Sequence, residues 1–343
     1  MKLATTLPAT ADPKVTIALA HDLDSAGIDA IWVAELYSFD AISILGYLAA
    51  RTERAQLGTG IASLYSRTPT LTAMTAAGLD AVSDGRFVLG LGASGPQVIE
   101  GWHGVPYDHP IERTREVVEI CRKVWRREPV VHDGTYYRIP LPPDEGTGLG
   151  KPLKLINRPV RAEIPIYIAA LGTRNLQLTA EIADGWLPHL FHPDRAGVWS
   201  ADLDAGFARR SPELGPLEIV ADVCVALGDG EQLAFEHARR KAALYVGGMG
   251  AKGSNFYNSL FQRYGYVAEA ETIQELYLSG RKEEAEAAVP DDFVAATTLA
   301  GDEGRVRERL EVYTAAGVTC LDMELVGPDP VSTVDTLRAW IGS

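Results

Sequence analysis

The chain has little cysteine, no long apolar run and no excess of positive charge. Its three cysteines, Cys121, Cys224 and Cys320, are odd in number and lack CxxC spacing, so we expect neither a disulfide framework nor a zinc site. No stretch reaches the ~18 uninterrupted apolar residues of a membrane span, and polar residues and prolines break the N-terminal apolar run too early for a signal peptide. The net charge of -14 argues against nucleic-acid or anionic-membrane partners. We therefore expect a cytoplasmic protein.

What the chain does contain is an alternation of short strand-like runs and amphipathic helical runs, which is typical of a parallel sheet. Eight runs are expected to be strands, and they are 2–7, 29–34, 55–61, 86–91, 164–169, 184–189, 217–226 and 318–325. Such a pattern predicts an α/β fold, a (β/α)8 TIM barrel with insertions. An open doubly wound sheet is the alternative, but the glycine spacing at Gly90, Gly92 and Gly95 is by itself only a weak indication of a dinucleotide site.

The length of 343 residues exceeds the ~250 of a plain barrel, and we expect one domain over 1–343 with two insertions. The first, near 128–163, is rich in proline and glycine, and its segments 130–139 and 151–160 are expected to form the two arms of a hairpin. The second, near 250–296, has helical pieces without a barrel strand.

Active sites of TIM barrels lie at the C-terminal ends of the strands, so the residues just after each strand are the candidates. Few of them are charged, which disfavours a hydrolase with two metals or two carboxylates, and the histidines have no metal-site spacing. Glu35, after the second strand, is the candidate catalytic residue. A carboxylate in the partly apolar opening at the C-terminal end of the barrel has a tunable pKa. Its alternative role is to cap the next helix. Trp102, His103 and His189 are candidates for a substrate pocket, with aromatic packing as the alternative.

Glycine-rich segments follow the third and fourth strands, LGTGIASLYSR at 57–67 and LGLGASGPQ at 89–97. Glycine permits close approach of the backbone, so a flat ligand lying there is one interpretation and a tight strand end is the other. Gly172 and Thr173 start a helix after the fifth strand, where free N–H groups favour a phosphate. An ordinary N-cap by Thr173 is the alternative. A flat surface at the glycine-rich strand ends and a phosphate site at the helix start would together suit a flavin-like molecule that lies across the C-terminal opening of the barrel.

The motif IWVAE at 31–35 and three longer segments resemble the luciferase-like family, in particular its branch similar to F420-dependent methylene-tetrahydromethanopterin reductase. The segments are LGTGIASLYSRTP at 57–69, SDGRFVLGLGASGPQVIEGWHG at 83–104 and IPIYIAALGTRNLQLTAEIADGWLP at 164–188. The resemblance implies a flavin or deazaflavin bound at the strand ends, with a non-proline cis peptide bond at Gly60–Ile61 behind its ring. The contacts it implies with the cofactor are Gly60, Ile61, Ser63, Gly92, Ala93, Ser94 and Gln97, together with Glu35 for the ring and Ala170, Gly172 and Thr173 for the phosphate.

The function that the resemblance implies is hydride transfer between C5 of coenzyme F420 and a small organic substrate, with a CH–OH, CH–NH or C=C group as the reacting bond. Two alternatives stay open, an FMN-dependent luciferase-like monooxygenase and a non-catalytic flavin- or deazaflavin-binding barrel. Relatives similar to F420-dependent glucose-6-phosphate dehydrogenase place a glutamate after the fourth strand, where this chain has Gly95, Pro96 and Gln97, so a sugar-phosphate reaction is not expected. A homodimer or higher homo-oligomer is expected from the family, although the sequence does not identify the contact surface.

Overall fold

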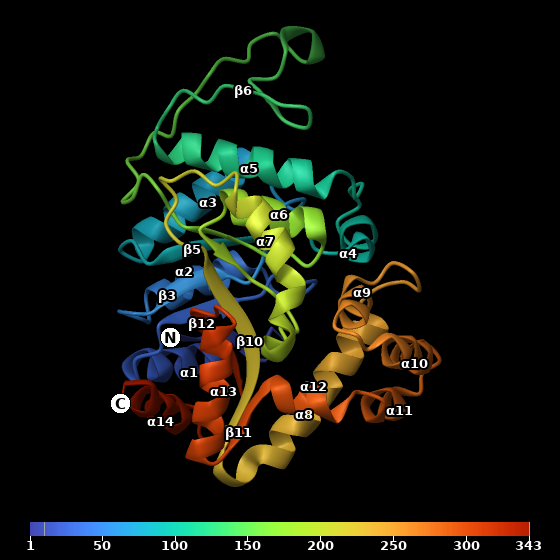
Figure 1. Ribbon diagram of the computed structural model, residues 1–343. Helices are drawn as coiled ribbons and strands as arrows, with labels where there is room; N and C mark the ends of the chain where they lie inside the picture. Colours follow the sequence, from blue (N-terminus) through green and yellow to red (C-terminus); the bar gives the residue numbers. More distant parts are fainter. Residues whose placement is uncertain (10, 343) are drawn as a thin grey trace.

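A computed structural model describes residues 1–9 and 11–342 (Figure 1). Eight of its strands close into a ring. The ring strands are β1 (Lys2–Leu7), β2 (Ala30–Val33), β3 (Gln56–Thr59), β5 (Phe87–Gly92), β8 (Ile166–Ile168), β9 (Gly185–Trp186), β10 (Glu218–Leu227) and β12 (Cys320–Leu325). Each pairs in parallel with the next, and β12 returns to β1. The fold is the (β/α)8 TIM barrel that the sequence predicts.

Side chains fill the inside of the barrel. One buried layer comes from six of the strands and packs against Leu187; its members are Ala4, Ala30, Trp32, Val88, Tyr167, Val220 and Cys320. Successive side chains of a strand point to opposite faces, so the residue two positions further along also faces inwards. On four strands these residues are Thr6, Gly90, Asp222 and Asp322. They form the next layer toward the C-terminal ends, which is the mouth of the barrel.

Helices cover the outside of the barrel (Figure 1). They are α1 (Pro13–Ser25), α2 (Ala41–Ala49), α3 (Pro69–Val82), α5 (Pro110–Trp125), α6 (Thr173–Ile182), α7 (Ser200–Phe207), α8 (Glu231–Ala243), α13 (Glu303–Ala315) and α14 (Pro330–Gly342). Asp12, Asp40, Thr68 and Asp302 cap the first turns of α1, α2, α3 and α13, because each side chain accepts a hydrogen bond from a first-turn N–H. No described helix is both long enough and apolar enough to cross a membrane.

The hairpin in the first insertion differs from the expectation. The strands β6 (His132–Asp133) and β7 (Arg138–Ile139) pair with each other, so the hairpin forms within 130–139, and residues 151–160 contain no strand. The physical reason is local, because a four-residue turn, 134–137, joins the two strands, and the Gly134 N–H donates a 3.0 Å hydrogen bond to the Tyr137 carbonyl. Glu116 on α5 holds the turn by accepting hydrogen bonds from the backbone N–H groups of residues 135–137. The segment projects beyond α5 at the top of Figure 1.

The second insertion is helical and lies to the right of the barrel in Figure 1. It contains α9 (Phe256–Arg263), α10 (Val267–Leu278), α11 (Lys282–Ala287) and α12 (Asp291–Ala296), and it follows a π-helical turn at Leu244–Gly248. A strand that the sequence analysis did not expect, β11 (Thr298–Gly301), follows α12 and pairs with the C-terminal half of β10.

Candidate active site

The strand ends after β3 and β5 lie side by side, which brings the first set of expected cofactor residues together. In the two-residue strand β4 (Ala62–Ser63), Ser63 lies opposite Gly92 of β5. The Gly60–Ile61 peptide bond is cis, as the resemblance implied. A Cβ on Gly92 would lie 2.7 Å from Cδ1 of Ile61, so the Ile61 side chain packs directly over this glycine. The result is a wall of backbone and one aliphatic side chain, which we call the glycine wall: Gly60, Ile61, Ser63 and Gly92.

Gly90 has a purely structural reason to be glycine. A Cβ there would lie 1.8 Å from the carbonyl oxygen of Thr59 on the neighbouring strand. The Thr59 hydroxyl also donates a hydrogen bond to the Gly90 carbonyl at 2.7 Å. The two strands therefore approach too closely at this point for any side chain, and no ligand is needed to explain the residue.

The remaining residues of this loop line its exposed side. Ala93 and Ser94 are half-buried, whereas Gln97 is exposed in the first turn of the short helix α4 (Pro96–Gly101). Ser94 has a φ of 58°, in the left-handed region, and its carbonyl accepts a 3.4 Å hydrogen bond from the Tyr107 hydroxyl. The chain thus turns sharply just beyond Gly92.

The start of α6 forms the next part of the mouth. Its N-cap is Gly172 rather than Thr173, and no side chain caps its first turn. Gly172 and Thr173 are exposed, Ala170 is buried, and the Ala169 N–H bonds to the Leu91 carbonyl, which places this turn beside the end of β5. Uncapped N–H groups at a helix N-terminus favour an anion such as a phosphate.

Glu35, the expected catalytic carboxylate, follows β2 and is paired with Arg67. Its two oxygens accept hydrogen bonds from the two terminal nitrogens of Arg67 at 2.6 and 2.7 Å. Only 10% of the Glu35 side chain and 16% of the Arg67 side chain are exposed. The bonds to Glu35 raise the pKa of Arg67. Both carboxylate oxygens are thus engaged, and a catalytic role for Glu35 stays a prediction.

The three expected substrate-pocket residues do not come together. Trp102 and His103 are exposed at the end of α4, and the Trp102 ring lies 6.4 Å from that of Tyr37, which is also exposed. His189 lies inside the mouth, where its Nδ1 is 3.3 Å from Oδ2 of Asp222. Burial lowers the pKa of His189 to about 4, although Asp222 acts in the opposite direction.

Opposite the glycine wall lies a partly buried ionic cluster, in which sequence reasoning missed Asp222, Lys241 and His237. Lys241 of α8 contacts Oδ2 of Asp222 at 2.7 Å and also pairs with Glu324. His237, one turn earlier on α8, contacts the second oxygen of Glu324 at 2.6 Å. Burial alone would raise the pKa values of both acids, but the Lys241 ammonium outweighs it and lowers them. The two carboxylates likewise raise the pKa of Lys241 despite its burial.

Asp322 is a separate acidic group in the same layer. Its Oδ2 accepts a 2.7 Å hydrogen bond from the hydroxyl of Thr6, while its Oδ1 is buried and has no hydrogen-bond partner among the described residues. Burial raises the pKa of Asp322 to about 7, and Asp222 and Glu324 add to this, whereas Thr6 and Lys241 oppose it. The sequence did contain a signal, because acidic residues inside apolar strand runs are seldom buried unless they are paired.

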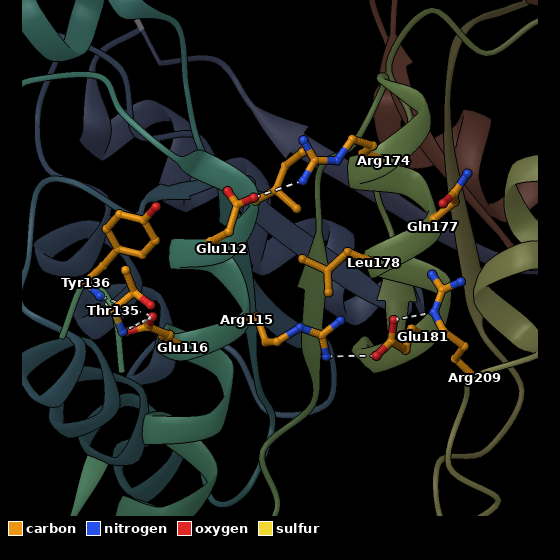
Figure 2. A pocket seen from close by; sticks show the side chains of 11 residues that line it. Glu112, Arg115, Glu116, Thr135, Tyr136, Arg174, Gln177, Leu178, Glu181 and Arg209 are labelled. Atoms are coloured by element: carbon orange, nitrogen blue, oxygen red, sulfur yellow. Dashed lines mark hydrogen bonds and ion pairs between the residues drawn. The ribbon is translucent and has the colours of Figure 1, made fainter. Parts of the chain in front are cut away.

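Figure 2 shows an open groove of about 480 Å³ on the outside of the barrel, between α5, α6 and the first insertion. Its charged side chains are already engaged with partners inside the protein. Arg174 contacts Glu112, and Glu181 lies between Arg115 and Arg209. With its charges satisfied internally and the outer helices separating it from the mouth, the groove is not our candidate site.

Comparisons with known proteins agree with this geometry. The model of the family described as luciferase-like monooxygenase matches residues 1–320. A Mycobacterium tuberculosis protein assigned by name to the coenzyme F420-dependent oxidoreductases is 44% identical over 310 residues, covering 89% of this chain and 88% of the relative. The 5,10-methylenetetrahydromethanopterin reductase of Archaeoglobus fulgidus is 29% identical over 329 residues, with 94% and 92% covered.

Among solved structures, the coenzyme F420-dependent tetrahydromethanopterin reductase from Methanopyrus kandleri superposes with a TM-score of 0.81 at 24% identity. The match covers 98% of this chain and 96% of that one. At this identity the likeness supports the fold.

Proposed function

The chain belongs to the luciferase-like monooxygenase family, and we propose that within it the protein is an F420-dependent oxidoreductase that transfers a hydride to or from a small organic substrate. The observation that carries the proposal is the pairing of the glycine wall with an uncapped helix N-terminus on neighbouring strand ends. The 44% identity to a protein named as F420-dependent supports the choice of cofactor.

The residues present fit a deazaflavin. The glycine wall offers a backbone surface against which a planar ring can lie, because any larger side chain at Gly92 would collide with Ile61. The first turn of α6 offers unpaired N–H groups at Gly172 and Thr173 for the phosphate. When bound, F420 supplies the hydride-carrying carbon, and the protein supplies orientation and shielding from water. The Arg67–Glu35 pair would close the ring site on the β2 side.

The substrate would occupy the space between the glycine wall and the ionic cluster. Tyr37 and Trp102 expose 61% and 67% of their surface at the rim of this space and offer an apolar, aromatic approach. We therefore propose a moderately apolar small molecule whose reacting group is polar.

A fluorescence titration of the purified protein with F420 and, separately, with FMN tests the proposal. Binding of F420 at least about 10-fold tighter than FMN, or 1.4 kcal/mol, is the expected result. Preference for FMN would instead support the monooxygenase alternative. Binding of neither would overturn the assignment to a redox cofactor, and F420 binding without turnover of any substrate would favour the non-catalytic barrel.

We further propose that the protein is a homodimer. The outer helices α2 and α3 pack side by side and expose Tyr47, Leu71 and Met74, each about half accessible to solvent. Light scattering should give twice the 37.0 kDa of one chain, and Met74→Glu should weaken the dimer, since a buried charge without a partner is costly at an interface. A wild-type protein that is monomeric in solution would contradict the proposed homodimer.

We also propose a single-domain organisation and a cytoplasmic location for the protein. Residues 1–343 would form one domain with the two insertions and should unfold in one cooperative transition. The three cysteines are buried and unpaired, which suits the reducing cytoplasm, so three free thiols should titrate after denaturation without a reductant.

A further inference from the structure

Asp322 differs from the other acids at the barrel mouth because no cation is paired with it. Asp222 and Glu324 share the Lys241 ammonium. In the described part of the chain no basic side chain forms an ion pair with Asp322, whose Oδ2 accepts only the Thr6 hydroxyl. Its Oδ1 is buried without a partner. A buried carboxyl oxygen without a hydrogen bond is costly, so this atom marks a place where a ligand can form one.

Asp322 also faces the glycine wall from the opposite side. It lies on β12, which β1 and β2 separate from β3 in the closed ring. The register places Asp322 opposite Ala4 and Asp222, in the inward layer above Cys320. The interior of an eight-stranded barrel is only wide enough for side chains or one small ligand. A ring against the glycine wall would therefore have Asp322 on the far side of the barrel mouth.

On the basis of the function proposed above, we propose that Asp322 is the acid–base residue that exchanges a proton with the substrate. When the substrate is oxidised, its C–H bond breaks and the hydride passes to C5 of F420. The O–H or N–H bond on the same carbon breaks and its proton goes to Oδ1 of Asp322, while a C=O or C=N bond forms. Asp322 then releases the proton to solvent. The reverse direction starts with protonated Asp322 and reduced deazaflavin, and both electrons travel with the hydride.

The surroundings of Asp322 suit this role. Thr6 on β1, Asp222 on β10, Glu324 on β12 and Lys241 on α8 are the polar groups that act on it. Lys241 is already held by two carboxylates, so Asp322 is the third acid at a site with one ammonium. Its pKa of about 7 lies near neutral pH, where an acid–base catalyst is most effective.

The inference also narrows the substrate class. An alcohol–carbonyl or amine–imine pair exchanges a proton as well as a hydride and needs such a group. An iminium cation that is already formed accepts a hydride alone at its carbon and does not need one. We therefore assign the site to substrates of the first kind.

The test compares Asp322→Asn and Thr6→Val with Asp335→Asn, which changes an exposed acid on α14. Each protein is assayed from pH 5 to pH 9 with oxidised F420 and a panel of small alcohols and amines, and with reduced F420 and the matching ketones and imines.

Asp322→Asn should keep the wild-type Kd for F420 but lose about 10²–10⁴-fold in kcat, together with the limb of the kcat/KM profile near pH 7. Thr6→Val should shift that limb to higher pH, because a hydrogen bond that favours the ionised carboxyl is lost. Asp335→Asn should behave as wild type.

Wild-type kcat and an unchanged pH limb in Asp322→Asn would overturn the inference and leave the F420-dependent function standing. A wild-type protein that binds F420 but turns over neither panel would also count against it. Failure to bind F420 at all would overturn the proposed function itself, so the two failures are distinguishable.

Discussion

Gly92 and Gly95 stand three residues apart in one loop, yet a methyl group would meet very different surroundings at each. At Gly92 the added Cβ would lie 2.7 Å from Cδ1 and 2.9 Å from Cγ1 of Ile61, whereas at Gly95 nothing lies within 4 Å. Gly92→Ala must push Ile61 toward the space proposed for the ring, so we expect F420 affinity to fall by about 10-fold or more, or 1.4 kcal/mol. Gly95→Ala is the matched control, and equal losses in both variants would contradict the placement of the ring.

Lys241 is the ammonium that holds two buried carboxylates together. Only 12% of its side chain and 11% of the Asp222 side chain are exposed. Lys241→Met would remove the ammonium that both acids share and leave them with only the imidazoles of His189 and His237, and breaking such a buried network costs about 3–5 kcal/mol. Urea unfolding at pH 7 should show this loss, whereas Lys252→Met, at an exposed position, should change stability little. A loss below about 1 kcal/mol, the value of an exposed pair, would mean that the cluster is solvated.

Asp322 should also affect stability in a pH-dependent way. Its pKa is raised from 3.8 to about 7, so between these values the unfolded chain releases the proton first. The native state binds more protons than the unfolded state in this window, and stability is therefore lost as the pH rises. Asp322→Asn removes this penalty and should stabilise the protein more at pH 8 than at pH 4, by up to about 1.4 kcal/mol for each pH unit that separates the two pKa values. The same change in unfolding free energy at both pH values would argue against a raised pKa.

Individual side chains of the site were the hardest features to predict from sequence. The glycines and Glu35 follow strands directly, and their positions could be inferred from the rule that barrel sites lie at strand ends. The bond between Glu35 and Arg67 joins residues 32 positions apart and has no local signal. Asp222, Lys241 and Asp322 were missed because two lie within strands and the third lies on a helix, and only the closed barrel brings them together.

At the scale of elements, the first turn of α6 gives a clean test of the phosphate site. The N-cap Gly172 has a φ of −83°, and a Cβ there would meet nothing within 4 Å, so other residues fit. Both Gly172→Asp and Gly172→Asn should cap the helix and change stability by only a few tenths of a kcal/mol. Only the aspartate places a negative charge where the phosphate would bind.

We therefore expect Gly172→Asp to weaken F420 binding by at least about 10-fold, or 1.4 kcal/mol, while Gly172→Asn has a much smaller effect. The deazaflavin chromophore without its phosphate should bind all three proteins equally in the same titration. A loss of that phosphate-free ligand as well would place the ring, rather than the phosphate, at α6.

Strands were predicted well where they belong to the barrel ring, and poorly outside it. The eight barrel strands have apolar runs bounded by turn residues, and β1 was found over the very range expected, Lys2–Leu7. The hairpin predicted in the first insertion was wrong because the turn at 134–137 pairs the two halves of 130–139 with each other rather than with 151–160. The strand β11 was missed since Thr298–Gly301 contains only one large apolar side chain, Leu299, and therefore gives a weak strand pattern.

On the scale of the whole molecule, the closed ring explains why distant segments make one site. Residues near 6, 60, 92, 172, 222 and 322 meet because parallel strands all end at the same face of a barrel. One wall of this mouth is backbone with little charge, and the other is a buried set of ionisable groups. Such an asymmetric mouth suits a flat cofactor on the first side and proton exchange with a substrate on the second.

The most direct test is a crystal structure of the protein soaked with F420. The account predicts density for the ring against Gly60, Ile61 and Gly92, with the phosphate at Gly172 and Thr173 and the C5 face turned toward Asp322. Density in the outer groove of Figure 2 instead, or a mouth that stays empty at saturating F420, would contradict it.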